Sequence, residues 1–91
     1  MENKTLVNYH AFFVKRFGIE LTDGKLKRKP KEHAVLLVFI NKILSETDIR
    51  QDKLAMFLGK SQGLISRSLT KYHNRKHTGN KHINKIESQL T

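Results

Sequence analysis

Polar and basic side chains recur at helical spacing in the second half of the chain. They are Gln62, Ser66, Arg67, Thr70 and Lys71. Amide, hydroxyl and guanidinium groups are the side-chain types that hydrogen-bond base edges and phosphates in the grooves of DNA. The residues between them recur at i, i+3, i+4 and i+7, which is typical of the buried face of one helix. These are Ile65, Ser68, Leu69 and Tyr72. The stretch therefore predicts a helix with one buried face and one face suited to nucleic acid.

A glycine and a serine mark the start of this helix. An apolar segment comes first, and it holds Leu54, Ala55, Phe57 and Leu58. Gly59 follows at once, and because glycine takes a positive φ without strain, it predicts the end of a first helix. Ser61 can cap the second helix, since its hydroxyl accepts from a free N–H of the first turn. Residues 51–72 thus predict a helix-turn-helix. The alternative is an ordinary tight turn in a small helical core, with Gly59 only a helix stop.

The spacing of this stretch resembles the general helix-turn-helix of bacterial repressors over roughly 20 residues, beginning at Gln51. Ala55 stands where that motif needs a small residue between crossing helices. Gly59 follows four residues later at the turn, and Ile65 stands where the second helix packs against the first. Lys60 departs from the motif, which usually carries an apolar residue there.

The charge of the chain indicates an anionic partner. The formal net charge is +10, from 18 Lys and Arg against 8 Asp and Glu. From Gly59 to Thr91 there are seven basic residues and one acid, Glu87, and residues 24–31 hold five basic residues and no acid. Nucleic acid is the first candidate and an anionic membrane surface the second. A merely solvated surface is the alternative, but it would not by itself predict such a separation of signs.

Length and composition predict one soluble, intracellular domain over residues 1–91. The chain has no cysteine, which excludes disulfides and thiolate metal sites. Its longest apolar run, Ala34 to Ile40, is far too short to cross a membrane. The N-terminus lacks the charged-then-apolar order of a signal peptide. We expect no membrane association and a cytoplasmic location beside the nucleoid.

Periodicity and breakers predict an all-α fold of four to five helices. A first helix runs from Thr5 to Phe17 and ends at Gly18. A second begins at Pro30, runs to about Glu46, and is apolar all round, which predicts a central, buried helix. Thr47 or Asp48 is expected to cap the helix that follows. The C-terminal tail, 76–91, contains a last short helix from His82 to Leu90, which docks on the domain, joins a second copy as a homodimer, or frays.

Residues 24–31 form a basic segment between the first two helices. Pro30 excludes a helix interior at its end. Leu26 is expected to pin the segment to the core. Its exposed side chains are then suited to phosphates or to the minor groove, and they are Lys25, Lys27, Arg28 and Lys29. The alternative is a solvated run of charge.

With these elements placed, residues 5 to 72 resemble the DNA-binding domain of the bacterial replication initiator DnaA and, more distantly, the Trp repressor. The first helix with its phenylalanines (8–19), the basic loop (25–29), the long central helix (30–46) and the first motif helix (54–59) are similar to that domain. The resemblance implies that the second motif helix enters the major groove and the basic loop contacts the adjacent minor groove or its phosphates. The family's Arg-Asp-His-Thr-Thr signature is absent, because residues 61–65 read Ser-Gln-Gly-Leu-Ile. Recognition of the DnaA box is therefore not expected.

These patterns together predict sequence-specific binding of double-stranded DNA by a small bacterial or phage regulator of transcription or replication. The candidate contacts are Lys25, Lys27, Arg28, Lys29, Lys60, Ser61, Gln62, Gly63, Ser66, Arg67, Thr70 and Lys71. A rival is a protein-interaction module of DnaA-like fold that inhibits a replication or transcription factor. RNA binding is disfavoured, because most aromatic residues stand at core spacing.

The sequence contains no pattern of residues that indicates an enzyme. There is no Gly-rich phosphate loop and no cysteine nucleophile, and we expect neither catalysis nor a cofactor. His73 and His77 could share a helix face and hold a metal, but the next histidine, His82, lies across Gly79. Surface histidines beside phosphates are the better interpretation.

Overall fold

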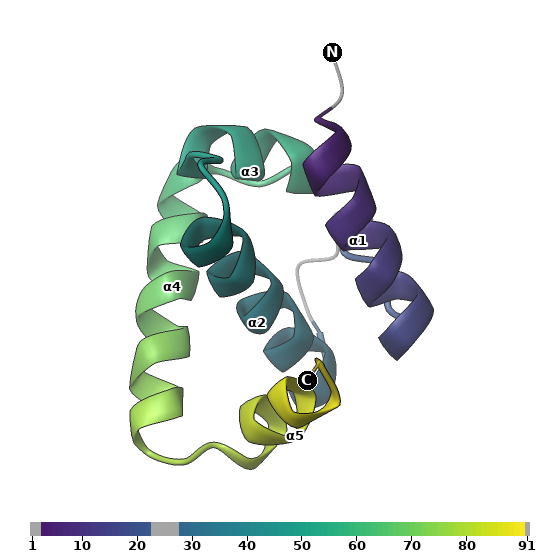
Figure 1. Cartoon of the computed structure of the whole chain (residues 1–91). Coiled ribbons are helices and arrows are strands. Elements are labelled where there is room, and N and C mark those ends of the chain that lie inside the picture. The colour runs from purple at the N-terminus through teal and green to yellow at the C-terminus, as the bar shows by residue number, and fades with distance from the viewer. Residues whose placement is uncertain (1–2, 23–27, 91) are drawn as a thin grey trace.

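The computed structural model describes residues 3–22 and 28–90, which form five helices and no strand. The helices are α1 (Lys4–Phe17), α2 (Pro30–Glu46), α3 (Gln51–Leu58), α4 (Gln62–His77) and α5 (Lys81–Leu90), as Figure 1 shows. This confirms the all-α prediction and both of the first two predicted helices. None of the helices within the described ranges has the length and apolarity that a membrane span needs.

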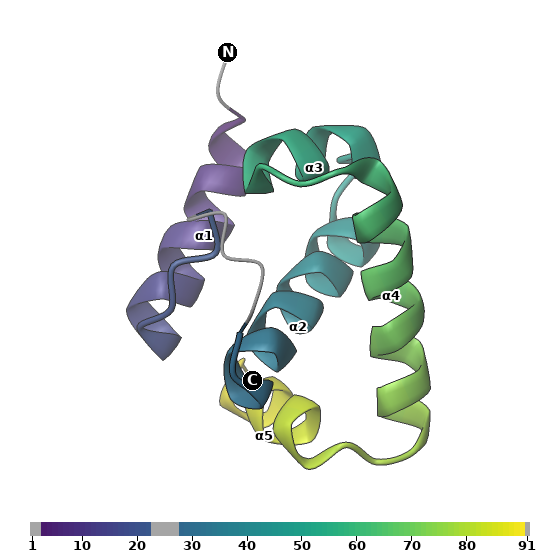
Figure 2. The same cartoon turned by 180° about the vertical axis from the view of Figure 1, so that it is seen from behind.

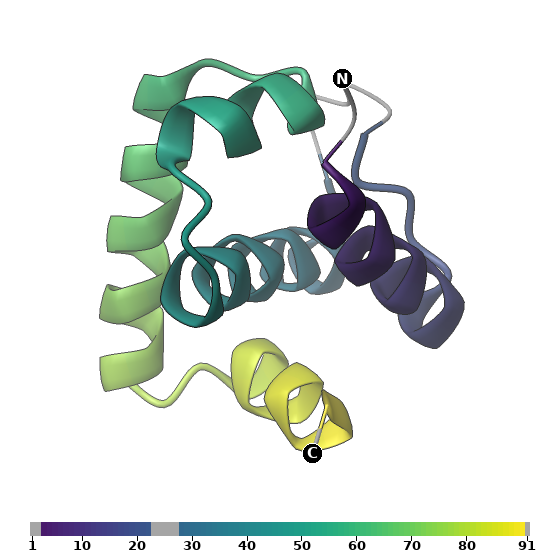
Figure 3. The same cartoon turned by 45° about the horizontal axis from the view of Figure 1, so that its top comes forward.

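Helix α2 runs through the centre of the molecule. Figures 1, 2 and 3 show α1 on one side of it, α4 on the other, α3 across one end and α5 below. The stretch Ala34–Ile40 is buried throughout, and Ile43 continues it. An amphipathic helix could bury only one stripe, so an all-round apolar sequence requires neighbours on several sides. The central buried helix predicted from the sequence is confirmed.

The segment after α1 is fixed to the core by a side chain of α1. Gly18 ends the helix with a φ of +67°. Three residues on, Leu21 is fully buried, and its N–H donates to Nε2 of His10 across 3.2 Å. The His10 ring in turn meets the Phe57 ring edge to face, with centroids 5.5 Å apart. Helix α1 is thereby tied both to the chain that follows it and to α3.

The turn between α3 and α4 has the predicted chemistry. Gly59 adopts a φ of +67°, and its N–H donates to the Met56 carbonyl. The N–H of Lys60 reaches back to the Ala55 carbonyl at 2.9 Å, so both bonds close the last turn of α3. Ser61 then accepts from the Leu64 N–H at 3.2 Å and caps α4. Residues 51–77 thus form two helices joined by a short, hydrogen-bonded turn.

The predicted cap of α3 is wrong. The residue before α3 is Arg50, which makes no side-chain cap bond. The Thr47 hydroxyl instead donates to the Ile43 carbonyl at 2.6 Å and accepts from the Ile49 N–H. It is therefore used to end α2, and Asp48 lies too early in the chain to reach the first turn of α3.

Helix α5 docks on its own domain. Ile83 and Ile86 are buried against α2, and Asn80 caps the helix by accepting from the Ile83 N–H at 3.1 Å. Glu87 accepts from the Tyr72 hydroxyl and pairs with the Lys76 ammonium, and both of these residues lie on α4. The sequence left three alternatives for this segment, namely docking on the domain, pairing with a second copy, or fraying, and the structure shows docking on the domain. A homodimer through this segment would have to use the polar face of α5.

Candidate nucleic-acid interface

The outer face of α4 carries the residues that the sequence assigned to DNA. All six positions of this face are exposed: Gln62, Gly63, Ser66, Arg67, Thr70 and Lys71. The opposite face is buried at Ile65, Ser68 and Tyr72, as predicted. Leu69 is only half-buried, because it lies at the border between the two faces, where it lines a hollow together with Leu44. We call the six exposed residues the α4 face.

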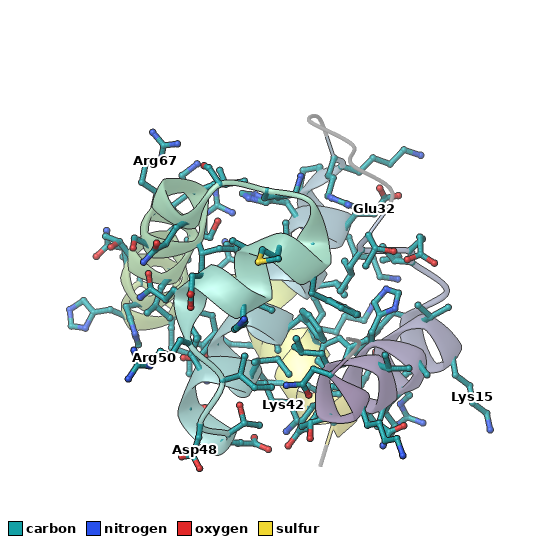
Figure 4. All side chains as sticks on the ribbon, turned by 90° about the horizontal axis from the view of Figure 1, so that it is seen from above. Lys15, Glu32, Lys42, Asp48, Arg50 and Arg67 are labelled. Carbon is teal, nitrogen blue, oxygen red and sulfur yellow. The ribbon has the colours of Figure 1, made fainter. Side chains whose placement is uncertain are left out.

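Hydroxyl groups on and beside the α4 face are engaged within the protein. Ser66 Oγ donates to Gln51 Oε1 at 2.6 Å, and Thr70 Oγ1 donates to the Ser66 carbonyl at 3.2 Å. Among the described residues, no hydrogen bond or ion pair holds the side chains of Gln62 and Arg67. Figure 4 shows Arg67 pointing away from the body of the molecule. The Gln62 amide and the Arg67 guanidinium are thus exposed groups of this face that have no partner among the described residues.

The start of α3 borders the start of α4 and adds residues that were not predicted to belong to the site. A hollow of about 640 Å³ lies between them, lined by Leu44, Arg50, Gln51, Asp52, Gln62 and Leu69. Arg50 is exposed and stands on the same side of the molecule as Arg67 (Figure 4). Gln51 offers an amide N–H₂ beside the α4 face. The sequence did offer a signal for Gln51, because this residue is the first position of the predicted helix-turn-helix.

The basic segment is described only from residue 28. Lys25, Lys27 and Leu26 lie outside the described residues. Lys29 is exposed and precedes α2 without capping it. Arg28 is half-buried, and its Nη1 donates to the Glu20 carbonyl at 3.1 Å, so this side chain also holds the two chain segments together.

Arg28 lies close to the second half of α4. The pKa of His33 falls below its ordinary value, first because the ring is partly buried and then because Arg75, Lys71 and Arg28 repel its protonated form. Three cations from the basic segment and from α4 therefore act on one imidazole. Positive charge continues from the α4 face along α4 to the end of the basic segment.

The remaining candidate at the turn, Lys60, is half-buried between α3 and α4, while Ser61 is exposed. His73, His77 and His82 are all exposed on α4 and α5. Within residues 3–22 and 28–90, no three His, Asp or Glu side chains gather closely enough to hold a metal ion. The site is thus built of hydrogen-bonding and cationic groups on one helix, its neighbour and the end of the basic segment.

Comparisons of the chain with protein-family models, with curated proteins and with solved structures found no match. The resemblance to the DnaA domain and the Trp repressor stays a prediction that rests on the residues quoted for it.

Proposed function

We propose that this protein binds double-stranded DNA by inserting the α4 face into the major groove. One observation carries the proposal. The second helix of a helix–turn–helix unit buries Ile65 and Tyr72 and leaves an unpaired amide and guanidinium, Gln62 and Arg67, outside. An α-helix fits the major groove, and these two groups pair bidentately with adenine and guanine respectively. Regulation of transcription or replication by occupying a site on DNA is the role that follows.

Charge supports the same proposal. The chain carries a formal net charge of +10, and no acid stands between Gly59 and Ile86. Lys71 and Arg75 extend the positive surface along α4 toward Arg28. Neutralising backbone phosphates with such side chains releases counterions, and this supplies affinity that does not depend on base sequence. Asp52, in the first turn of α3, is the acid that borders the hollow beside Gln62.

Protein interaction is the second candidate. Within the described part of the chain, three large apolar side chains are exposed, and Met56 is the most exposed at 75 %, followed by Phe12 and Val7. Met56 lies on α3, outside the α4 face. A protein-interaction module would depend on these side chains and would bind DNA weakly.

Titration of labelled duplex and single-stranded DNA of the same sequence, followed by fluorescence anisotropy over a salt series, tests the proposal. We expect tighter binding of the duplex, with a negative slope of log K against log salt. Arg67→Gln should weaken duplex binding. Lys15→Gln removes the same charge from α1, at the side of the molecule away from α4 (Figure 4), and is the matched control. Equal affinity for single strands, or equal losses in both variants, would contradict insertion of the α4 face.

A further inference from the structure

A second hollow lies at the other end of α4. It has a volume of about 340 Å³ and is lined by Arg28, Pro30, His33, Arg75, Asn80 and His82. These residues come from the end of the basic segment, the start of α2, the end of α4 and the start of α5. The hollow is about 20 Å along α4 from Gln62, given the rise of 1.5 Å per residue, so it is separate from the start of the α4 face.

Among residues 3–22 and 28–90, those that line this hollow are basic or uncharged, and none is an acid. Arg75 and Arg28 contribute two guanidinium groups, and His33 and His82 contribute two imidazoles. Arg75 Nη1 lies 3.3 Å from His33 Nδ1. Glu87, the acid of α5, is already bonded to Tyr72 and Lys76. Arg75 thus lies against an imidazole and not against a carboxylate of the described residues, an arrangement that an anion would stabilise.

His33 and the start of α2, both at this hollow, carry further hydrogen-bond donors. The neighbouring cations favour neutral His33, and a neutral ring that accepts from Arg75 at Nδ1 carries its proton on Nε2 as a donor. Pro30, the first residue of α2, has no N–H, and Lys29 makes no side-chain cap bond. The first-turn N–H groups of α2 therefore lack a side-chain acceptor from the capping position, and a helix start favours negative charge.

We infer that this hollow binds one phosphate group. A planar guanidinium presents a fork of donors that matches phosphate oxygens, and an imidazole N–H adds a further donor. Two sources share this chemistry: a phosphodiester of the DNA backbone, and the phosphate of a small molecule. The proposal concerns the free protein and does not rest on DNA binding.

Titration of the full chain with inorganic phosphate tests the site, at an ionic strength kept constant with chloride and read from the imidazole and backbone amide NMR signals. We expect a saturable change at His33 and Arg75. Arg75→Gln should weaken phosphate binding about tenfold or more, because a charge-assisted pair of bonds is lost. Lys15→Gln, with the same loss of charge elsewhere, should leave the affinity unchanged. Shifts that do not saturate, or equal affinity in Arg75→Gln and the parent, would overturn the proposal.

A second variant covers the case in which Arg75→Gln does not fold. His82→Gln changes an exposed side chain at the start of α5, so the fold should tolerate it. It should lower phosphate affinity with an unchanged melting temperature, whereas an unaltered affinity would contradict the role of His82 in the site. The salt dependence of duplex binding then identifies the source. If the ligand is a DNA phosphodiester, the slope of log K against log salt should be smaller for His82→Gln and Arg75→Gln, and added phosphate should compete with DNA. If the ligand is the phosphate of a small molecule, both variants should keep the slope of the parent.

Discussion

The hydroxyl of Ser66 donates to Oε1 of Gln51 across 2.6 Å, and this bond joins the α4 face to the start of α3. Because Oε1 accepts this bond, the N–H₂ group of Gln51 remains available as a donor, in a side chain that lines the same hollow as Gln62. A donor at this place suits a backbone phosphate, which fixes the register of a helix in the groove without reading sequence.

The Gln51–Ser66 pair should therefore act as one unit in DNA binding. Gln51→Ala and Ser66→Ala should each weaken binding to every duplex, and the double variant should lose less than the sum. A coupling free energy of about 0.5–1.5 kcal/mol is expected, the usual worth of one hydrogen bond. A double-mutant cycle measured by anisotropy gives this value. Strictly additive losses would mean that the two side chains contribute independently.

Two glycines of the turn region should respond oppositely to the same substitution. Gly59→Ala places a Cβ at a φ of +67° and should lower the free energy of unfolding by about 1–2 kcal/mol. Gly63→Ala lies in a helical position with nothing within 4 Å of the added Cβ, and should raise it by about 0.5–1 kcal/mol. Urea denaturation measures both. A stabilising Gly59→Ala would show that the turn does not need a left-handed residue.

Arg28 and Lys29 are neighbours in sequence, but we expect Arg28 to contribute to the stability of the fold and Lys29 to the affinity for DNA. Lys29→Ala should reduce the salt slope of duplex binding by about 0.9, the value for one phosphate contact, with an unchanged melting temperature. Arg28→Ala should lower the melting temperature, because the bond to the Glu20 carbonyl is lost. DNA titrations over a salt series measure the slope, and thermal denaturation measures the melting temperature. An unchanged slope for Lys29→Ala would remove this residue from the DNA contacts.

His33 should make folding stability depend on pH. Burial and the cations of Arg75, Lys71 and Arg28 hold its pKa below 6.5 in the folded state. The unfolded state therefore binds more protons once the pH falls below the unfolded pKa of about 6.5, so stability is full above that value and declines as the pH falls toward the folded pKa. Urea denaturation from about pH 8 to about pH 5 should show this slope.

His33→Gln should reduce the slope, and His73→Gln, at an exposed position of α4, should keep it. An identical pH dependence in the parent and in His33→Gln would contradict the assignment to His33.

Helix positions followed from local signals in the sequence. Gly18 and Gly59 end helices through their own positive φ, and Ser61 caps a helix through its own hydroxyl, so each role depends on the residue itself. The structure confirms all three predicted roles. Thr47 was misassigned because its hydroxyl had two possible partners, and the choice depends on where α2 ends. Competition of this kind between local bonds is invisible in a pattern of residue types.

Contacts between distant segments could not be predicted from spacing. Gln51 and Ser66 stand 15 positions apart and meet only because α3 crosses α4. Arg75 and His33 stand 42 positions apart and meet because α4 packs on α2. The pattern predicted the burial of α2 and, except at Leu69, the buried face of α4, but which faces meet is decided by tertiary packing.

Selection of binding sites from a random duplex library, with the parent, Gln62→Ala, Arg67→Ala and Lys15→Ala, tests the central claim most directly. We expect one enriched motif for the parent and for Lys15→Ala. Each α4 variant should lose the preference at one or two base positions, worth about 1–3 kcal/mol of discrimination, while it keeps non-specific binding. No enriched motif for the parent, or the same motif for all four proteins, would contradict base reading by the α4 face.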